Sequence, residues 1–486
     1  MADKIVISNV DEVYIKVYCS EGTAHELREY FTFHVPGFQF TPQYRAKLWD
    51  GKIRLFDIRT KQLYRGLVPN IVRFCEERDY EWEYDNEIYD EEFSVTEALE
   101  FIKTLNIPSK YQPRDYQIEA FVHAIRSRRT LLLSPTASGK SFIIYLIMRY
   151  INARKTLIIV PTISLVSQLA SDFADYGYDS DVHVHRIFGG QDKLSDRPVT
   201  ISTWQSLYTL PKSYFKQFEV IVGDEAHLFK AKSLTEIMTA LTNAKYRIGT
   251  TGTLDGTKTH KLVLEGLFGP VRKVTTTKEL MDQGHVADFL IKCLLVKHPD
   301  SVCQAMKNAT YQQEIEYLVL NESRNKFISN LALSLEGNTL VLYQYVDKHG
   351  KILQEMINNK ANDRKVFFVS GEVDGDAREE IRHIVEQEKD AIIVASFGTF
   401  STGINIRNLH NIIFASPSKS RVRNLQSIGR GLRKSENKNS AVLFDIADDM
   451  RHKKHENYTL KHFAERIKIY SEEKFTFKIY KIELKG

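Results

Sequence analysis

The clearest candidates for chemistry lie in the segment SPTASGKS, which spans residues 134–141. An apolar run ends at this segment, and a helical stretch begins after it at Phe142. A loop of small residues between a strand and a helix is typical of a P-loop, whose backbone N–H groups bind phosphates. Lys140 would add positive charge there, and the Ser141 hydroxyl would bind Mg²⁺. The alternative is a turn of small residues with an exposed lysine, and Ser134 stands where the general pattern has Gly.

Two adjacent carboxylates follow a second apolar run. Residues 220–227 read VIVGDEAH, so Asp224 and Glu225 stand where a strand would end. In a Walker B site the first carboxylate holds the water shell of Mg²⁺, and the second orients and deprotonates the attacking water. An acidic strand end in solvent is the alternative. The P-loop upstream in the same block favours the catalytic interpretation.

A pair of arginines, Arg430 and Arg433, lies in the segment QSIGRGLR at 426–433. Their spacing of three places both on one face of a helix. Planar guanidinium donors stabilise charge on a transferred phosphoryl group, as an arginine finger does. A solvated basic helix is the alternative, but the segment follows a strand of a second α/β block, which favours the finger.

Short apolar runs must position these residues. They cover 130–135, 156–162, 182–189, 199–205, 219–225 and 246–253 in a first block, and 339–346, 365–371, 391–398, 411–417 and 441–447 in a second. Several runs lack polar alternation, as expected for strands buried on both faces, and helical stretches separate them. The pattern predicts an α/β protein with two doubly wound parallel sheets. Ligands in such sheets bind beyond the carboxyl ends of the strands.

Composition sets the broad class. The chain has 486 residues, of which 43% are hydrophobic and 27% charged, and its net charge is only +5. This composition excludes a disordered chain and a collagen-like fibre. Because the net charge is small, only the local distribution of charge can indicate binding partners. The scattered cysteines, Cys19, Cys75, Cys293 and Cys303, indicate reduced thiols rather than a zinc site. No secretory signal is apparent, and the apolar helical stretch 142–151 is too short to span a bilayer, so we expect a cytoplasmic protein without membrane contact.

The motifs, in their order along the chain, resemble those of superfamily 2 helicases and translocases of the DEAH type. RDYQ at 114–117 resembles the upstream glutamine motif, VPTISLVSQL at 160–169 motif Ia, STWQ at 202–205 motif Ib, TGT at 251–253 motif III, and STGIN at 401–405 motif V. Residues 343–350 resemble motif IV. Asn405 and Ser427 stand where many members have Asp and Arg.

This resemblance implies ATP and Mg²⁺ as cofactors and a role for each matched residue. Catalytic roles fall to Lys140, Asp224, Glu225, Gln426, Arg430 and Arg433, and the metal would be held through the nucleotide by Ser141 and Asp224. ATP contacts are implied for Arg114, Gln117, Pro135, Thr136, Ala137, Ser138, Gly139, Lys140, Ser141, Gly403 and Asn405. Coupling is implied for His227, Thr251, Gly252 and Thr253, and DNA contact for Pro161, Thr162, Thr203, Trp204, Gln205, Ser401 and Thr402.

The N-terminal segment indicates a particular family within this superfamily. HELREYFTFHVPGFQFTPQYRAKLWDGKIRLFD at 25–57 is similar to the leading domain of the UvsW helicases of T4-like bacteriophages. The resemblance implies a phage recombination, repair and replication helicase in the host cytoplasm. Such an enzyme acts on branched DNA: it migrates Holliday junctions, regresses forks and dissociates R-loops or RNA:DNA hybrids. Phage single-stranded-DNA-binding or recombination proteins are implied as partners. A duplex translocase that does not separate strands, an RNA helicase and a non-catalytic junction-binding scaffold remain as alternatives.

The leading segment also suggests its own DNA contacts. Residues 45–56 read RAKLWDGKIRLF, which predicts a β-hairpin with a type I′ turn at Asp50-Gly51. One face of that hairpin would carry basic and aromatic side chains for phosphates and bases: Arg45, Lys47, Trp49, Lys52 and Arg54. A polar face that meets only water, with Trp49 packed on a neighbouring domain, is the alternative.

The local distribution of charge supports DNA contact by the leading segment. Residues 41–73 hold eight basic and two acidic side chains, whereas residues 74–100 hold one basic and twelve acidic ones. We interpret the acidic stretch as a solvated face or helix rather than a DNA mimic. Together these patterns predict a small N-terminal α+β nucleic-acid-binding domain with an acidic connector (1–105) and two tandem RecA-like domains (106–275 and 276–486).

Overall fold

The apolar runs of the first block form a seven-stranded sheet in the computed structural model, and every strand pairing in it is parallel. The strand order is β13-β7-β12-β11-β8-β10-β9. The strands are β7 (Arg129–Leu133), β8 (Thr156–Val160), β9 (Val184–Ile187), β10 (Val199–Thr203), β11 (Val220–Asp224), β12 (Tyr246–Thr251) and β13 (Val271–Lys273). Residues 182 and 183, predicted as strand, belong instead to helix α8 (Ser180–His183), which Asp179 caps.

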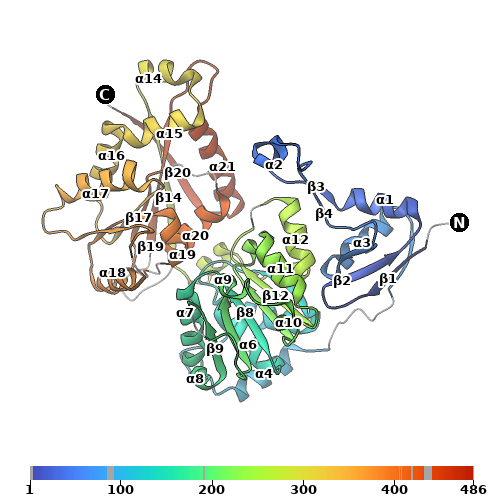
Figure 1. Cartoon of the computed structure of the whole chain (residues 1–486). Helices are drawn as coiled ribbons and strands as arrows, with labels where there is room; N and C mark the ends of the chain where they lie inside the picture. Colours follow the sequence, from blue (N-terminus) through green and yellow to red (C-terminus); the bar gives the residue numbers. More distant parts are fainter. Residues whose placement is uncertain are drawn as a thin grey trace. The chain divides into compact units, whose positions relative to one another are not determined.

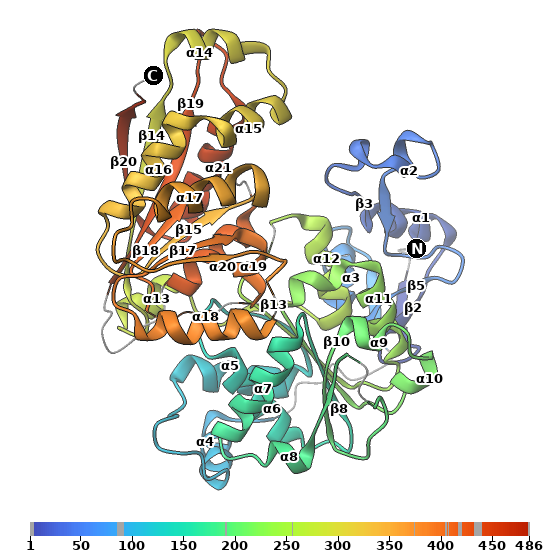
Figure 2. The ribbon, with the colours of Figure 1, turned by 60° about the vertical axis from the view of Figure 1, so that its left-hand side comes forward.

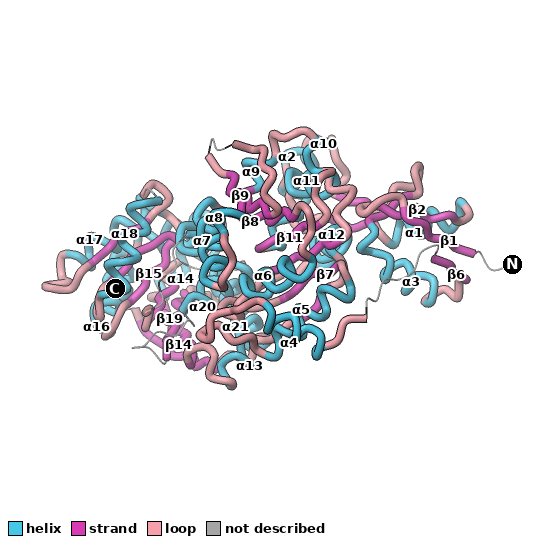
Figure 3. The backbone as a smooth tube through the Cα atoms, turned by 90° about the horizontal axis from the view of Figure 1, so that it is seen from below, coloured by secondary structure: helices cyan, strands magenta, loops and turns pink. Residues whose placement is uncertain are grey.

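Helices cover both faces of this first sheet. They are α4 (Val95–Thr104), α5 (Asp115–Ser127), α6 (Lys140–Ile151), α7 (Ile163–Asp175), α9 (Trp204–Leu207), α10 (Lys212–Phe215), η3 (Ala226–Lys230), α11 (Lys232–Ala240) and α12 (Lys258–Phe268). Figure 3 shows α6 and α7 on one side of the strands and α10 and α11 on the other. Neighbouring residues of β8 point to opposite sides, so Ile158 joins one buried cluster and Ile159 the other.

The second block forms another seven-stranded parallel sheet, in the order β16-β17-β15-β18-β19-β14-β20. Its strands are β14 (Asp288–Lys297), β15 (Thr339–Tyr343), β16 (Val366–Val369), β17 (Ile392–Ser396), β18 (Asn411–Phe414), β19 (Ser440–Asp449) and β20 (Thr476–Glu483). The prediction of two doubly wound parallel sheets is therefore confirmed. The sequence did not indicate β13, β14 or β20.

The helices of the second block surround its sheet. They are α13 (Thr277–Asp282), α14 (Asp300–Ala305), η4 (Met306–Asn308), α15 (Tyr311–Leu320), α16 (Glu322–Ser334), the π-helical turn η5 (Val346–Gly350), α17 (Lys351–Asn358), α18 (Gly375–Gln387), α19 (Phe397–Gly403), α20 (Arg421–Gly431) and α21 (Tyr458–Glu472). Figure 2 shows α16 and α17 side by side across the strands.

A small domain of mixed structure precedes the first sheet. Its four strands are β1 (Lys4–Asn9), β2 (Tyr14–Tyr18), β5 (Gln62–Tyr64) and β6 (Glu81–Tyr84), in the order β5-β2-β1-β6. Helices α1 (Glu21–Tyr30) and α3 (Val68–Glu76) pack on the face that carries Ile7 and Val17 (Figure 1). The predicted α+β character of this domain is confirmed.

The predicted β-hairpin at 45–56 is wrong. Residues before the Asp50-Gly51 pair form helix α2 (Pro42–Arg45), which follows the short turn η1 (Phe38–Phe40) and is capped by Thr41. Strand β4 (Lys52–Arg54) instead pairs antiparallel with β3 (Thr32–His34). A capping threonine followed by proline at the first helical position favours a helix start, and this local signal outweighs the turn propensity of Asp-Gly.

The small domain docks on the first α/β domain through partly buried charged side chains and close backbone contact. The Glu12 carboxylate accepts hydrogen bonds from Arg65 at 2.7 Å and from Arg129, the first residue of β7, at 2.6 Å. Turn η2 (Arg65–Leu67) lies against α12, and a Cβ at Gly66 would collide with the carbonyl oxygen of Glu265. The two domains therefore belong to one compact unit, which contains most of residues 1–275, while residues 276–486 form most of a second unit.

The structure describes residues 4–84, 92–189, 192–254, 256–373, 375–403, 406, 408–416, 420–431 and 440–484. Within these ranges, none of the helices combines the length and the apolar character needed to cross a bilayer. Of the acidic stretch 74–100, the described parts contain the end of α3, strand β6 and the start of α4.

Candidate active site

The carboxyl edge of the first sheet gathers the sequence motifs of the first unit. SPTASGKS follows β7, VPTISLVSQL begins at the end of β8, STWQ spans the end of β10, DEAH begins at the end of β11, and TGT begins at the end of β12. Because parallel strands end at the same edge, all five segments meet there.

A left-handed glycine and close contacts with the upstream glutamine motif shape the P-loop. Gly139 has φ +80 and caps α6, and a Cβ there would collide with the Gln117 side-chain amide. Gln117 is buried, and its Oε1 accepts a hydrogen bond from the Arg114 backbone N–H at 2.9 Å. Lys140 Nζ donates to the Ser134 carbonyl oxygen at 3.3 Å. The upstream glutamine motif therefore lies against the base of the loop that it is expected to serve.

Asp224 ends β11 in a partly buried and electrostatically unfavourable position. Its Oδ1 accepts a hydrogen bond from Thr250 Oγ1 at 2.8 Å. Burial raises the pKa of Asp224 above its ordinary value, the neighbouring Glu225 raises it further, and the Lys140 charge opposes both. Two close carboxylates with one nearby ammonium leave negative charge that a cation would compensate.

Glu225 occupies a strained backbone position. Its φ of +48 lies in the left-handed region, which costs a residue with a side chain about 1 kcal/mol or more. The turn brings Glu225 Oε2 within 3.3 Å of His227 Nδ1, and the same nitrogen lies 3.0 Å from Thr251 Oγ1. Thr251 Oγ1 donates to the Thr253 carbonyl oxygen at 3.0 Å. A continuous polar chain thus joins the carboxylate to the TGT segment.

The residues of the first unit that are expected to contact DNA differ in solvent exposure. Pro161 and Thr162 are partly exposed at the end of β8, and Thr162 caps α7 by accepting from the Leu165 N–H. Thr203 is buried, whereas Gln205 is exposed. Trp204, the first residue of α9, is partly exposed, and its ring packs against an apolar cluster.

The structure describes only some of the motif residues of the second unit. Gln426 lies in α20, and Ser401, Thr402 and Gly403 lie at the end of α19. The side chains of Ser401, Thr402 and Arg430, together with the whole of Asn405 and Arg433, lie outside the described residues.

A buried network that the sequence did not indicate holds the ends of strands in the second unit. Arg324 on α16 donates through Nε and Nη2 to the Asp448 carboxylate at 2.8 and 2.9 Å, and His298 Nε2 lies 3.0 Å from Asp448 Oδ1. His349 contacts Ser416 Oγ, just after β18, at 3.0 Å. His349 belongs to the segment that resembles motif IV, but that resemblance did not predict the network.

The predicted DNA-facing residues of the small domain surround α2 and β4. Arg45, Lys47 and Arg54 are exposed, whereas Trp49 and Lys52 are partly exposed. Trp49 Nε1 donates to the Lys52 carbonyl oxygen at 2.9 Å, and Arg54 forms an ion pair with Asp50. A hollow of about 570 Å³ is lined there by Gln39, Tyr44, Arg45, Lys47, Leu48, Trp49 and Asp50.

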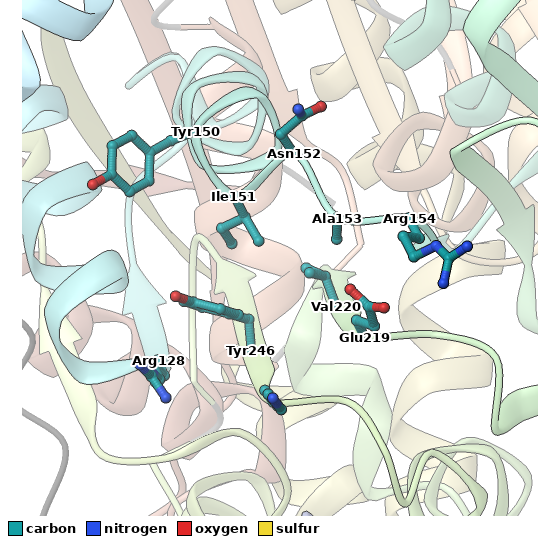
Figure 4. Close-up of a pocket in the computed structure, with 10 residues that line it drawn as sticks. Arg128, Tyr150, Ile151, Asn152, Ala153, Arg154, Glu219, Val220 and Tyr246 are labelled. Atoms are coloured by element: carbon teal, nitrogen blue, oxygen red, sulfur yellow. The ribbon is translucent and has the colours of Figure 1, made fainter.

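A second hollow, of about 430 Å³, lies at the opposite edge of the first sheet (Figure 4). Its lining includes Val220 and Tyr246, which begin β11 and β12, and Ile151, which ends α6. The amino ends of the strands point away from the P-loop, so this hollow is separate from the nucleotide-binding edge.

Comparisons with known proteins agree with the fold and the motifs. Three family models match: the N-terminal domain of the DNA helicase UvsW over residues 4–85, the res subunit of type III restriction enzymes over 110–256, and the helicase conserved C-terminal domain over 323–435. The chain is 37% identical to the ATP-dependent DNA helicase uvsW of Enterobacteria phage T4 over 98% of both chains. It is 26% identical to the DNA 3'-5' translocase XPB2 of Sulfurisphaera tokodaii over 70% of this chain and 82% of that protein.

A solved structure is similar over nearly the whole chain. The crystal structure of T4 UvsW matches 99% of this chain and 100% of its own, with 35% identity and a TM-score of 0.53. Two tandem RecA-like domains that carry these motifs define a superfamily 2 helicase, an ATP-dependent enzyme that acts on DNA. Within that class, the chain belongs to the UvsW helicase family.

Proposed function

We propose that the carboxyl edge of the first sheet binds and hydrolyses ATP with the residues brought together there. Gln117 and Arg114 would contact the adenine, while residues 135–139 and Lys140 would hold the phosphates. Glu225 would orient and deprotonate the attacking water. Gln426, Arg430 and Arg433 would contribute from the second unit, where the arginines would stabilise charge on the transferred phosphoryl group. Gly403 and Asn405 are proposed as further nucleotide contacts.

The residues present fit a Mg²⁺ ion held with the nucleotide. Ser141 and Asp224 offer hard oxygen ligands, which Mg²⁺ prefers. The partly buried pair of Asp224 and Glu225 supports a bound cation, because desolvation, and then the charge of Glu225, raises the pKa of Asp224. When bound, Mg²⁺ would supply charge compensation at the phosphates. His227 and the Thr251–Thr253 segment, linked to Glu225 by the 3.0 and 3.3 Å contacts, would couple the nucleotide state to the DNA contacts.

We further propose that branched DNA is the substrate: four-way junctions that migrate, forks that regress and RNA:DNA hybrids that dissociate, in recombination, repair and replication. The observation that carries this proposal is the small domain, whose exposed Arg45 and Lys47 lie beside partly exposed Trp49. Basic and aromatic side chains together suit phosphate contact and base stacking. A domain docked on the motor through Glu12 would hold one DNA arm while the motor moves another.

Two alternatives remain within the same class of motor. A translocase that moves along duplex DNA without separating strands is favoured by the likeness to the S. tokodaii translocase. An RNA helicase would use the same ATP site. The residues of motifs Ia, Ib and V would contact the nucleic-acid strand in either case: Pro161, Thr162, Thr203, Trp204, Gln205, Ser401 and Thr402.

The substrate proposal is tested by offering the chain three substrates with ATP: a mobile four-way junction, a plain 3′-tailed duplex and an RNA:DNA hybrid. We expect the junction and the hybrid to be resolved faster than the tailed duplex. Lys140→Ala should abolish hydrolysis and resolution while it retains DNA binding. Equal rates on all three substrates would contradict branch preference, and ATP hydrolysis by Lys140→Ala would contradict the assignment of the P-loop.

The role of the small domain has its own test. In the double variant Arg45→Ala/Lys47→Ala, junction affinity should fall, and the slope of log affinity against log salt should decrease by about 2, because each lost phosphate contact removes about 0.9. Arg73→Ala, an exposed arginine on α3, is the matched control and should keep the slope of the parent. An unchanged slope in the double variant would remove α2 from the DNA interface.

A further inference from the structure

A tyrosine from a different helix contacts the P-loop serine. Tyr176 caps the C-terminus of α7, and its Oη lies 2.9 Å from the Ser141 Oγ. Ser141 is the second residue of α6 and directly follows Lys140. Tyr176 belongs to none of the motifs described above, and 35 residues separate it from Ser141 in the chain.

The surroundings of Tyr176 fix its ring in place. Only 7% of the residue is exposed. Its ring makes edge contacts with Tyr111 and Phe142, at centroid distances of 5.0 and 4.9 Å, and a tilted contact with Tyr145 at 5.3 Å. The Tyr145 hydroxyl donates to the Tyr176 carbonyl oxygen at 3.3 Å. A side chain packed on three aromatic rings offers its hydroxyl from one defined position.

A tyrosine hydroxyl can both donate and accept a hydrogen bond.

The chemistry of a serine ligand shows what this contact does. A hydroxyl oxygen that binds a cation uses a lone pair for the metal, so its proton must be directed to another acceptor. The Tyr176 oxygen lies within hydrogen-bond distance to accept that proton. The same bond selects one rotamer of Ser141 from the staggered set, so that less conformational freedom is lost when a ligand binds.

We propose that Tyr176 is a positioning residue of the nucleotide site, which orients the Ser141 hydroxyl and thereby strengthens the Mg²⁺-dependent part of nucleotide binding. The inference rests on the metal-binding role proposed for Ser141. It adds a residue outside the motifs, contributed by the C-terminus of the helix whose N-terminus carries the Thr162 segment. That helix therefore connects the segment expected to contact DNA with the serine expected to contact the metal.

The test measures equilibrium binding of a fluorescent ADP to the full-length chain, with Mg²⁺ and with EDTA. In Tyr176→Phe we expect the affinity with Mg²⁺ to fall about three- to tenfold, the value of one neutral hydrogen bond, and the affinity in EDTA to stay that of the parent. Tyr178→Phe is the matched control, because its ring contacts the same Tyr145 but its hydroxyl is not the one that meets Ser141. It should bind like the parent under both conditions.

The serine variant separates this inference from the proposal on which it rests. Ser141→Ala should lose most of the Mg²⁺-dependent affinity, and adding Tyr176→Phe to it should cost little more, because the tyrosine would act through the serine. If Ser141→Ala binds like the parent, both the metal role and the inference fail. If Ser141→Ala loses affinity while Tyr176→Phe binds as tightly as the parent, or more tightly, only the inference fails. Equal losses for Tyr176→Phe with Mg²⁺ and in EDTA would indicate a merely structural role and would also overturn it.

Discussion

Protonation of His349 should make the second unit sensitive to mild acid. The residue is fully buried; its Nδ1 lies 3.0 Å from Ser416 Oγ, and its Nε2 lies 3.2 Å from Asn325 Oδ1. Burial, and then the charge of Arg324, lowers the pKa of His349 to about 3, although Asp448 opposes the shift. In the unfolded chain the same imidazole would titrate near its ordinary value of 6.5.

The sign and size of the effect follow from this difference. Below pH 6.5 the unfolded chain binds a proton that folded His349 refuses, so stability falls as the pH drops from 6.5 toward 3. The largest slope is about 1.4 kcal/mol per pH unit. Between pH 7.5 and 5.0 the loss from this residue alone should reach about 2 kcal/mol.

Hydrogen exchange of peptides from β15 and β18 measures the opening free energy of this unit separately from the first. We expect the parent to lose about 2 kcal/mol more between pH 7.5 and 5.0 than His349→Gln, which keeps a hydrogen-bonding side chain that does not titrate. The comparison uses the change with pH, so any destabilisation common to both pH values cancels. Parallel pH dependences in the two proteins would refute a buried neutral His349.

Two further changes test the buried contacts. Asp448→Asn leaves the guanidinium of Arg324 buried without its carboxylate, so hydrogen exchange of the second sheet should show an opening free energy lower by about 3–5 kcal/mol. Strand β8 of the first unit should keep its protection. A loss below 1 kcal/mol would contradict a buried ion pair. Gly66→Ala should separate the small domain from α12, because its Cβ would collide with backbone, and limited proteolysis should then cut between the domains. Gly22→Ala, whose Cβ would meet its nearest atom at 3.8 Å, is the control, and equal resistance of both variants would argue against close docking.

Much of the motor could be read from the sequence because its signals are local. A buried parallel strand is a short apolar run, and a phosphate-binding loop must consist of small residues between such a run and a helix. These rules placed Lys140, Asp224 and His227 in segments that follow strands, and the structure puts those segments at one edge of one sheet.

Other features depended on partners far away in the chain. The Asp50-Gly51 pair suggested a hairpin, but the partner of β4 is β3, some twenty residues upstream, and no turn signal encodes that pairing. Strand β20 is largely exposed, so it lacks the apolar run that marked the central strands, and its place is set by pairing with β14. Edge strands gain their structure from a neighbour more than from their own burial.

The sequence by itself determined the class of motor, because motif order and spacing are properties of the chain. Only the tertiary structure decided that Glu12 joins two domains through Arg65 and Arg129, and that Tyr176 meets Ser141. The chain holds 24 tyrosines, and nothing in the neighbours of Tyr176 distinguishes it from the others. The packing of α6 against α7 brings this tyrosine to the P-loop, since a contact between helices depends on how their faces meet and not on their local sequence.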